Sequence, residues 1–250
     1  ALPQGNHVNI GRLGGYYPLR HYRHCDWLIG NTPHLCDWLI TQGFNKKRVV
    51  YLPNFVEEKK GQKLSRALFD TPDDAPLILC LGRLHQNKAF DVALEALARL
   101  KKAYCWIAGA GPEQQALMNH ARQLSIASRV KFLGWRDDPS DLLASADIFL
   151  CSSRHEPLGN MVLEAWAQKC PVVAANAQGP SQLIRHDNDG LLCQIDDDCD
   201  MAHMLQRLID NPDLRKNLAL QAYRKLQKNF SKSSVTDLYQ QFFTQALQKN

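Results

Sequence analysis

The stretch SSRHEPLGNMVLEAWAQKCPVVAANAQGPSQLIRHDNDGLLC, residues 152–193, decides the fold because short apolar runs alternate in it with amphipathic ones. Residues 160–168 carry apolar side chains at helical spacing, and the run Val172–Ala175 fits a buried strand. A second helix is expected over Pro180–Ile184 and a further strand over Gly190–Cys193. Short apolar strands separated by helices predict a buried parallel sheet with right-handed crossovers.

The same alternation continues on both sides of this stretch. The expected elements upstream are the strands 77–81, 104–108, 130–133 and 147–151 and the helices 88–100, 113–124 and 140–144. Three helical stretches follow downstream, over 200–209, 213–229 and 233–248. The prediction is an α/β fold, a Rossmann-like parallel sheet with flanking helices. Ligands on such sheets bind beyond the carboxyl ends of the strands, where the turns at Gly82-Arg83 and Gly109-Ala110-Gly111 fall.

Two carboxylates flank the start of the helix expected after residue 159. Glu156 lies on a loop, because Pro157 and Gly159 do not fit a helix interior. Asn160 can cap the helix, which places Glu164 about one turn into it. Unpaired N–H groups and the positive end of the helix dipole create an anion site between the two carboxylates. A nucleotide-sugar, with hydroxyls at both ends and phosphates in the middle, fits this layout.

The ordered motifs resemble family 4 of the glycosyltransferases, retaining enzymes of the GT-B fold. One motif is similar to the donor-binding half of that family: Glu156 and Glu164 separated by seven residues, followed by PVVAA and a turn with glycine. The upstream motifs that resemble it, in the same order, are LILCLGRLHQNKAFDVALEAL (77–97), WIAGAGPE (106–113), VKFLGW (130–135) and ADIFLCSS (146–153). The variant Glu-Pro-Leu-Gly-Asn at 156–160 resembles bacterial envelope-sugar transferases in particular.

The resemblance implies a role for each charged residue of these motifs. Arg83 and Lys88 would contact the donor diphosphate and offset the charge of the departing nucleotide, so that no metal is required. Glu156 would lie near the donor sugar, as a nucleophile or beside a front-side reaction, and Glu164 near the ribose hydroxyls. The residues expected to hold the nucleotide-sugar are Gly82, Arg83, Lys88, Gly109, Gly111, Gly134, Gly159, Asn160, Met161 and Glu164.

Some of these residues also have an interpretation without a ligand. Arg83 and Lys88 would then be ordinary surface cations, and Glu164 would only complement the helix dipole. Leu133, Gly134 and Trp135 fit a base pocket, but a core position suits Trp135 equally well.

Two positions depart from the family pattern. Gln182 stands where the family usually has glutamate, which keeps the hydrogen bonding but not the charge. Leu13 precedes Gly14-Gly15 where the family often has His-Gly, and no nearby histidine fits that pattern. A metal site at His21, His24 and Cys25 is not expected, because no fourth ligand is nearby.

The resemblance also implies how the chain is divided. Residues 1–55, with strand-like runs at Trp27–Gly30 and Val49–Leu52, would be the end of an N-terminal acceptor domain. Residues 56–76 read as a linker, 77–232 as the donor domain and 233–250 as a crossover helix. We expect the apolar face of that helix to dock on residues 1–55 or to be buried in a homodimer, with packing on the donor sheet as the alternative.

Composition narrows the class of protein. A hydrophobic content of 45% and a charged content of 22% are ordinary for a globular chain. The eight cysteines lack Cys-x-x-Cys spacing, which indicates a reducing, cytoplasmic setting. Net charge is +5, with basic clusters that are either solvated or attracted to the inner membrane face. Nucleic-acid binding is not expected, because the sequence has no basic stripe with interleaved aromatic residues.

The sequence therefore predicts a retaining hexosyltransferase that moves a sugar from a nucleotide-sugar donor to a glycan or lipid-linked acceptor. Assembly of bacterial envelope polysaccharide or lipopolysaccharide is the expected setting. Two alternatives stay open at this point: a nucleotide-sugar epimerase of the same fold, and a non-catalytic nucleotide-binding domain.

Overall fold

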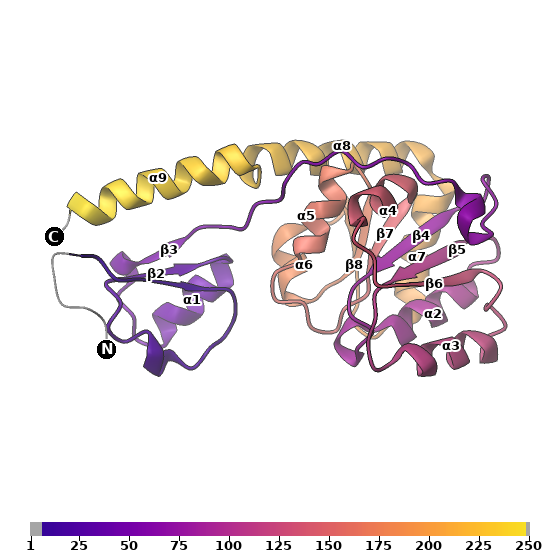
Figure 1. Ribbon diagram of the computed structural model, residues 1–250, viewed down its shortest axis with the longest axis horizontal. Coiled ribbons are helices and arrows are strands. Elements are labelled where there is room, and N and C mark those ends of the chain that lie inside the picture. Colours follow the sequence, from indigo (N-terminus) through magenta and orange to yellow (C-terminus); the bar gives the residue numbers. More distant parts are fainter. Residues whose placement is uncertain (1–6, 249–250) are drawn as a thin grey trace. The chain divides into compact units, whose positions relative to one another are not determined.

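The computed structural model of the protein describes residues 7–248 and divides the chain into two compact units (Figure 1). The larger unit runs from Val56 to Gln227. The smaller unit combines the residues up to Phe55 with those from Lys228 onward.

The larger unit is built on a six-stranded sheet in the order β6-β5-β4-β7-β8-β9. Its strands are β4 (Leu77–Leu81), β5 (Tyr104–Ala108), β6 (Val130–Gly134), β7 (Ile148–Cys151), β8 (Val172–Ala175) and β9 (Leu191–Cys193). Every neighbouring pair in this sheet is parallel. Strands β4, β7 and β8 are buried along their whole length, and β5 is buried after its first residue. Such burial is expected for a sheet covered on both faces. The predicted α/β fold is confirmed.

Helices cover both faces of this sheet (Figure 1). They are α2 (Phe90–Arg99), α3 (Gln114–Gln123), α4 (Pro139–Ser145), α5 (Asn160–Ala167), α6 (Gln178–Leu183), α7 (Asp198–Asp210) and α8 (Pro212–Asn229). Helix α2 packs against α3 and α7, while α4 packs against α5. The core between α2, α7 and the sheet includes the fully buried Ile107, Leu97 and Leu205.

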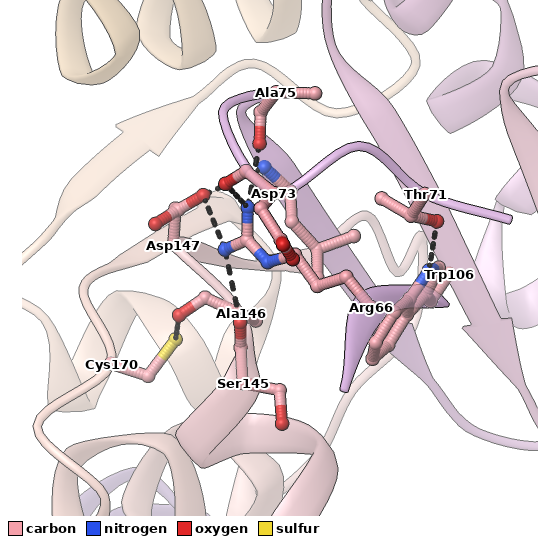
Figure 2. Close-up of polar contacts among 10 residues, drawn as sticks. Arg66, Thr71, Asp73, Ala75, Trp106, Ser145, Ala146, Asp147 and Cys170 are labelled. Carbon is pink, nitrogen blue, oxygen red and sulfur yellow. Dashed lines mark hydrogen bonds and ion pairs between the residues drawn. The ribbon is translucent and has the colours of Figure 1, made fainter. Parts of the chain in front are cut away.

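The segment 56–76, which the sequence marks as a linker, is largely irregular, belongs to the larger unit and is bonded to the rest of that unit through Arg66 (Figure 2). The Arg66 guanidinium donates to the carbonyl oxygens of Asp73, Ala75 and Ser145 and to the Asp147 carboxylate. The same carboxylate accepts the Leu77 N–H at 2.8 Å. This network joins the starts of β4 and β7, so the segment lies along the amino-terminal edge of the sheet.

The smaller unit holds a three-stranded parallel sheet of β1 (Ile10–Leu13), β2 (Trp27–Gly30) and β3 (Val49–Tyr51), with helix α1 (Pro33–Thr41). Thr32 caps α1, since its hydroxyl accepts the Leu35 N–H at 3.1 Å, and Pro33 follows as the first helical residue. Strand β1 is not among the runs expected from the sequence.

Helix α9 (Lys232–Gln248) docks on the sheet of the smaller unit, as the first of the two expected outcomes requires. Phe242 and Ala246 are buried together with Trp27, Ile29 and Leu52, and the Trp27 and Phe242 rings meet edge to face at 5.5 Å. The apolar face is narrower than its spacing indicates, because Phe243 is 45% exposed and Leu247 is 71% exposed.

All eight cysteines carry free thiols. Within the described residues, no helix combines the length and apolar character that crossing a membrane requires.

Candidate functional site

The strand order of the larger sheet reverses between β4 and β7. From β4 the chain builds outward through β5 and β6, then returns to place β7 on the other side of β4. The loops after β4 and β7 therefore leave the carboxyl edge of the sheet in opposite directions. A crevice for ligands is expected at such a reversal.

The two loops at this reversal bring Lys88 and Glu156 together. The Lys88 ammonium lies 2.5 Å from the Glu156 carboxylate oxygen Oε2, and the other carboxylate oxygen accepts the Gly159 N–H at 3.3 Å. The side chains are 23% and 13% exposed. The Lys88 side chain runs over Gly82, where an added Cβ would lie 3.3 Å from the lysine Cε. Four of the predicted site residues thus share one place.

Helix α5 begins beside this pair, one residue earlier than expected from its capping residue. Gly159 is the N-cap, with φ at +72°, and Asn160 is the first helical residue, so the predicted Asn160 cap is wrong. Glycine adopts this left-handed conformation without a side-chain clash, which lets the loop turn sharply into the helix. Because no residue of α5 precedes them, the N–H groups of Asn160 and Met161 have no acceptor within the helix.

Two glycines allow close backbone contacts under the site. A Cβ on Gly109, whose φ is +147°, would lie 1.8 Å from the Gly82 carbonyl oxygen. One on Gly111 would lie 2.2 Å from the Leu84 carbonyl oxygen. Gly109 and Gly111 therefore let the turn after β5 pack directly on the turn after β4.

Gly179 has the same function on the other side of the site. Its N–H donates to the Glu156 carbonyl oxygen at 2.7 Å, and a Cβ there would lie 2.6 Å from that oxygen. Gly179 is not among the site residues that the sequence predicts. Its position after β8, at the same edge as the other loops, was the available signal.

Arg83 and Glu164 are charged groups that the described part of the chain leaves without an ion pair. Arg83 is exposed, and neither its guanidinium nor the Glu164 carboxylate has a hydrogen-bond partner within residues 7–248. Glu164 is half-buried, and burial raises its pKa. A half-buried carboxylate without a partner is costly, so a ligand that supplies hydroxyl groups would stabilise it.

Trp135 follows the end of β6, and 74% of its surface is exposed. The alternative that places Trp135 in the core is therefore wrong. Gly134 precedes it with φ at +68°, a conformation that turns the chain away from the sheet. The indole consequently stands at the carboxyl edge as an exposed aromatic surface.

A cavity of about 770 Å³ opens beside this edge, between the loop after β4, α2 and α3. His85, Asp91, Glu113 and Arg154 are among the residues that line it. None of the predicted site residues does, so this cavity and the Lys88–Glu156 pair are different features of the edge.

The acidic run after β9 also has partners. Asp197 caps α7, because its carboxylate accepts the Asp200 N–H at 2.9 Å. Asp196 pairs with Arg154, and Asp198 pairs with Arg99. Over residues 7–248, no three His, Cys, Asp or Glu side chains gather closely enough to hold a metal ion.

The sheet order and the close glycine turns at the reversal define a doubly wound α/β domain of the nucleotide-binding class. The chain belongs to the glycosyl transferases group 1 family, whose profile matches residues 61–225. The predicted resemblance is confirmed at the level of this family and of its GT-B fold.

Two curated relatives come from Rhizobium meliloti. The lipopolysaccharide core biosynthesis glycosyltransferase LpsE is 37% identical over 93% of this chain, and LpsD of the same description is 32% identical over 96%. The aligned region spans 68% and 70% of their lengths. Among solved structures, HepE of Anabaena in complex with UDP superposes with a TM-score of 0.81 at 22% identity, covering 89% of this chain and 65% of HepE.

Proposed function

We propose that the larger unit binds a nucleotide-sugar and that the protein is a retaining glycosyltransferase of family 4, acting in lipopolysaccharide or related envelope glycan synthesis. The relatives LpsE and LpsD, described as lipopolysaccharide core biosynthesis enzymes, support this setting. The solved complex of HepE with UDP-glucose, with a TM-score of 0.82, supports a nucleotide-sugar as the donor.

The observation that carries the proposal is the Lys88–Glu156 pair at the amino end of α5. The Lys88 cation, the amino end of α5 and the exposed Arg83 surround a place suited to a diphosphate. Glu156 then faces the sugar end of the donor. Glu164, one turn along α5 and without a partner of its own in the described residues, faces the nucleoside end.

These groups suit the charge that sugar transfer creates. When the bond between the anomeric carbon and the phosphate oxygen breaks, the electron pair stays on the departing nucleoside diphosphate. Arg83, Lys88 and the α5 amino end would stabilise that charge without a metal ion. Glu156 holds the Lys88 ammonium in place before the donor arrives, so less reorganisation is needed.

The nucleoside would lie between Glu164 and the end of β6. The Glu164 carboxylate accepts hydrogen bonds from vicinal ribose hydroxyls, while the exposed Trp135 offers a surface on which a base can stack. Gly134 leaves room for the backbone to approach the base.

We further propose that the smaller unit belongs to the acceptor side of the enzyme and that the protein works in the cytoplasm, at the inner face of the membrane. Exposed basic clusters support this placement: Lys46-Lys47-Arg48, Lys59-Lys60 and Lys101-Lys102. Each basic residue close to an anionic lipid surface contributes about 1 kcal/mol of attraction.

The test is a binding and turnover screen of the chain with UDP-, GDP- and ADP-hexoses. We expect one nucleotide class to raise the melting temperature. At a ligand concentration of 100 times Kd, the added free energy of unfolding is about 2.7 kcal/mol. Arg83→Ala should abolish most of this shift, whereas Lys101→Ala, at the opposite edge of the sheet, should retain it. If no nucleoside diphosphate stabilises the chain at millimolar concentration, the proposal is wrong.

Binding without donor hydrolysis or transfer would favour a non-catalytic nucleotide-binding protein. Conversion of the donor to its sugar epimer would favour an epimerase.

A further inference from the structure

Arg154 joins three loops at the carboxyl edge of the sheet, two residues before Glu156. Its guanidinium forms a bidentate pair with Asp91 in the first turn of α2, at 2.9 and 2.6 Å. Its Nε lies 2.5 Å from a carboxylate oxygen of Asp196, which precedes α7. It also donates to the Gln86 carbonyl oxygen at 2.9 Å. Four acceptors from two other loops and a helix thus converge on one side chain.

The backbone around Arg154 continues this attachment. Its own N–H donates to the Asn87 carbonyl oxygen at 2.9 Å, and the next N–H, from His155, reaches the same oxygen at 3.3 Å. The hydroxyl of the buried Ser152 donates to the Lys88 carbonyl oxygen at 2.7 Å. Residues 152–155 are therefore bonded to residues 86–88, directly beside Lys88 and Glu156.

The turn that carries Lys88 needs such support. Ala89, the next residue, is fully buried and has φ at +50°, a left-handed conformation that is strained for a residue other than glycine. A residue in that conformation persists only where the surrounding contacts impose it. The bonds from Ser152 and Arg154 to the carbonyl oxygens of residues 86–88 are those contacts.

We propose that Arg154 is a positioning residue that holds the Lys88 turn against the Glu156 loop, so that the two side chains meet the donor in the reactive arrangement. The inference rests on the proposed function. The guanidinium bonds to neither Lys88 nor Glu156 within residues 7–248, so its effect passes through the two loops. Only a planar group with several fixed donors can serve Asp91, Asp196 and Gln86 at once.

The test compares Arg154→Lys and Arg154→Ala with wild type, using the nucleotide-hexose that the screen of UDP-, GDP- and ADP-hexoses identifies. Both variants should lower kcat by roughly 10- to 100-fold, the effect of a misplaced catalytic group, and change donor KM by less than about 3-fold. Arg154→Lys should not restore kcat, because lysine keeps the positive charge but lacks the planar guanidinium with several fixed donors. Amide exchange of residues 82–89 should be faster in both variants.

Arg99→Ala is the matched control. Arg99 also forms an ion pair between α2 and the start of α7, with Asp198, but it bonds to neither of the two loops within the described chain. Its kcat should equal that of wild type.

The outcomes separate this inference from the proposed function. If wild type neither binds nor turns over any nucleotide-sugar, the proposed function fails and the inference fails with it. If wild type is active and Arg154→Lys matches it in kcat and in exchange of residues 82–89, only the role of Arg154 is overturned. Lower melting temperature with normal kcat per folded molecule would make Arg154 a purely structural residue and also overturn it.

Discussion

The ammonium of Lys88 lies 2.5 Å from the Glu156 carboxylate, although 68 positions separate the two residues in the chain. Each side chain is less than a quarter exposed, so each is the main partner of the other's charge. Arg83, on the same loop, is exposed and has no such partner among the described residues. Two cations with one proposed role in the donor site thus differ in what they contribute to folding.

Lys88→Ala should therefore lower both stability and affinity. It leaves the Glu156 carboxylate with only the Gly159 N–H, which costs about 1–3 kcal/mol of unfolding free energy. Arg83→Ala should leave unfolding unchanged and weaken nucleoside diphosphate binding by about 1.5–3 kcal/mol. Urea denaturation and titration calorimetry measure the two effects. Equal destabilisation by both substitutions would contradict this division.

The sequence predicts the strands of the larger unit well because they are short apolar runs bounded by breakers. Val172–Ala175, between Pro171 and Asn176, has the same bounds in the sequence prediction and in the structure. Strand β1 is missed because Gly11 and Arg12 interrupt its apolar pattern. Its contacts are long-range, as when the Arg12 guanidinium donates to the Tyr239 hydroxyl at 2.8 Å.

Side-chain partners are less predictable than elements. The motif spacing places Lys88 and Glu156 at the same edge, but their pairing depends on rotamers and on the Gly82 backbone beneath the lysine. The exposure of Trp135 depends on the turn at Gly134, whereas residue type alone favours burial. The docking surface of α9 is narrower than the apolar face that its sequence spacing predicts, because only part of that face meets the sheet.

Glu164→Gln should stabilise the chain without ligand at neutral pH. Burial raises the pKa of Glu164 above its ordinary value of 4.5, so ionisation is less favourable in the folded state. Wild-type stability therefore falls as pH rises from that ordinary value to the folded one, and it stays lower above this window. The variant lacks this loss, and the two proteins should differ least below pH 4.5.

The same substitution should weaken nucleotide binding by about tenfold, since a neutral acceptor replaces a charged one opposite the ribose hydroxyls. Thermal unfolding across pH, with and without nucleotide, measures both effects. A variant less stable than wild type at pH 7 would show that Glu164 has a structural partner.

Trp135 should report nucleotide binding by fluorescence. It is 74% exposed, whereas Trp27, Trp106 and Trp166 are at most 3% exposed. A base stacked on the indole should quench its emission when excitation is at a wavelength that the base does not absorb. Trp135→Ala should lose most of the quenching and weaken binding by about 1 kcal/mol, a typical aromatic pair. Retention of the full signal in Trp135→Ala would place the base elsewhere.

The docking of α9 gives a prediction for the smaller unit alone. Phe242 is 3% exposed and meets Trp27 edge to face, in a small core that also includes Ile29 and Leu52. Phe242→Ala removes a buried aromatic ring and should cost about 3–5 kcal/mol. In so small a core, this loss should release α9 and expose strand β2.

Phe243→Ala is the control. The Phe243 ring is 45% exposed, so its removal should lower the free energy of unfolding by less than about 1 kcal/mol. Amide exchange of Trp27–Gly30 and of α9 measures the effect in this unit separately from the larger one. We expect both segments to exchange faster in Phe242→Ala, with residues 77–81 unchanged. Equal exchange in the two variants would mean that α9 is held by contacts other than its Phe242 core.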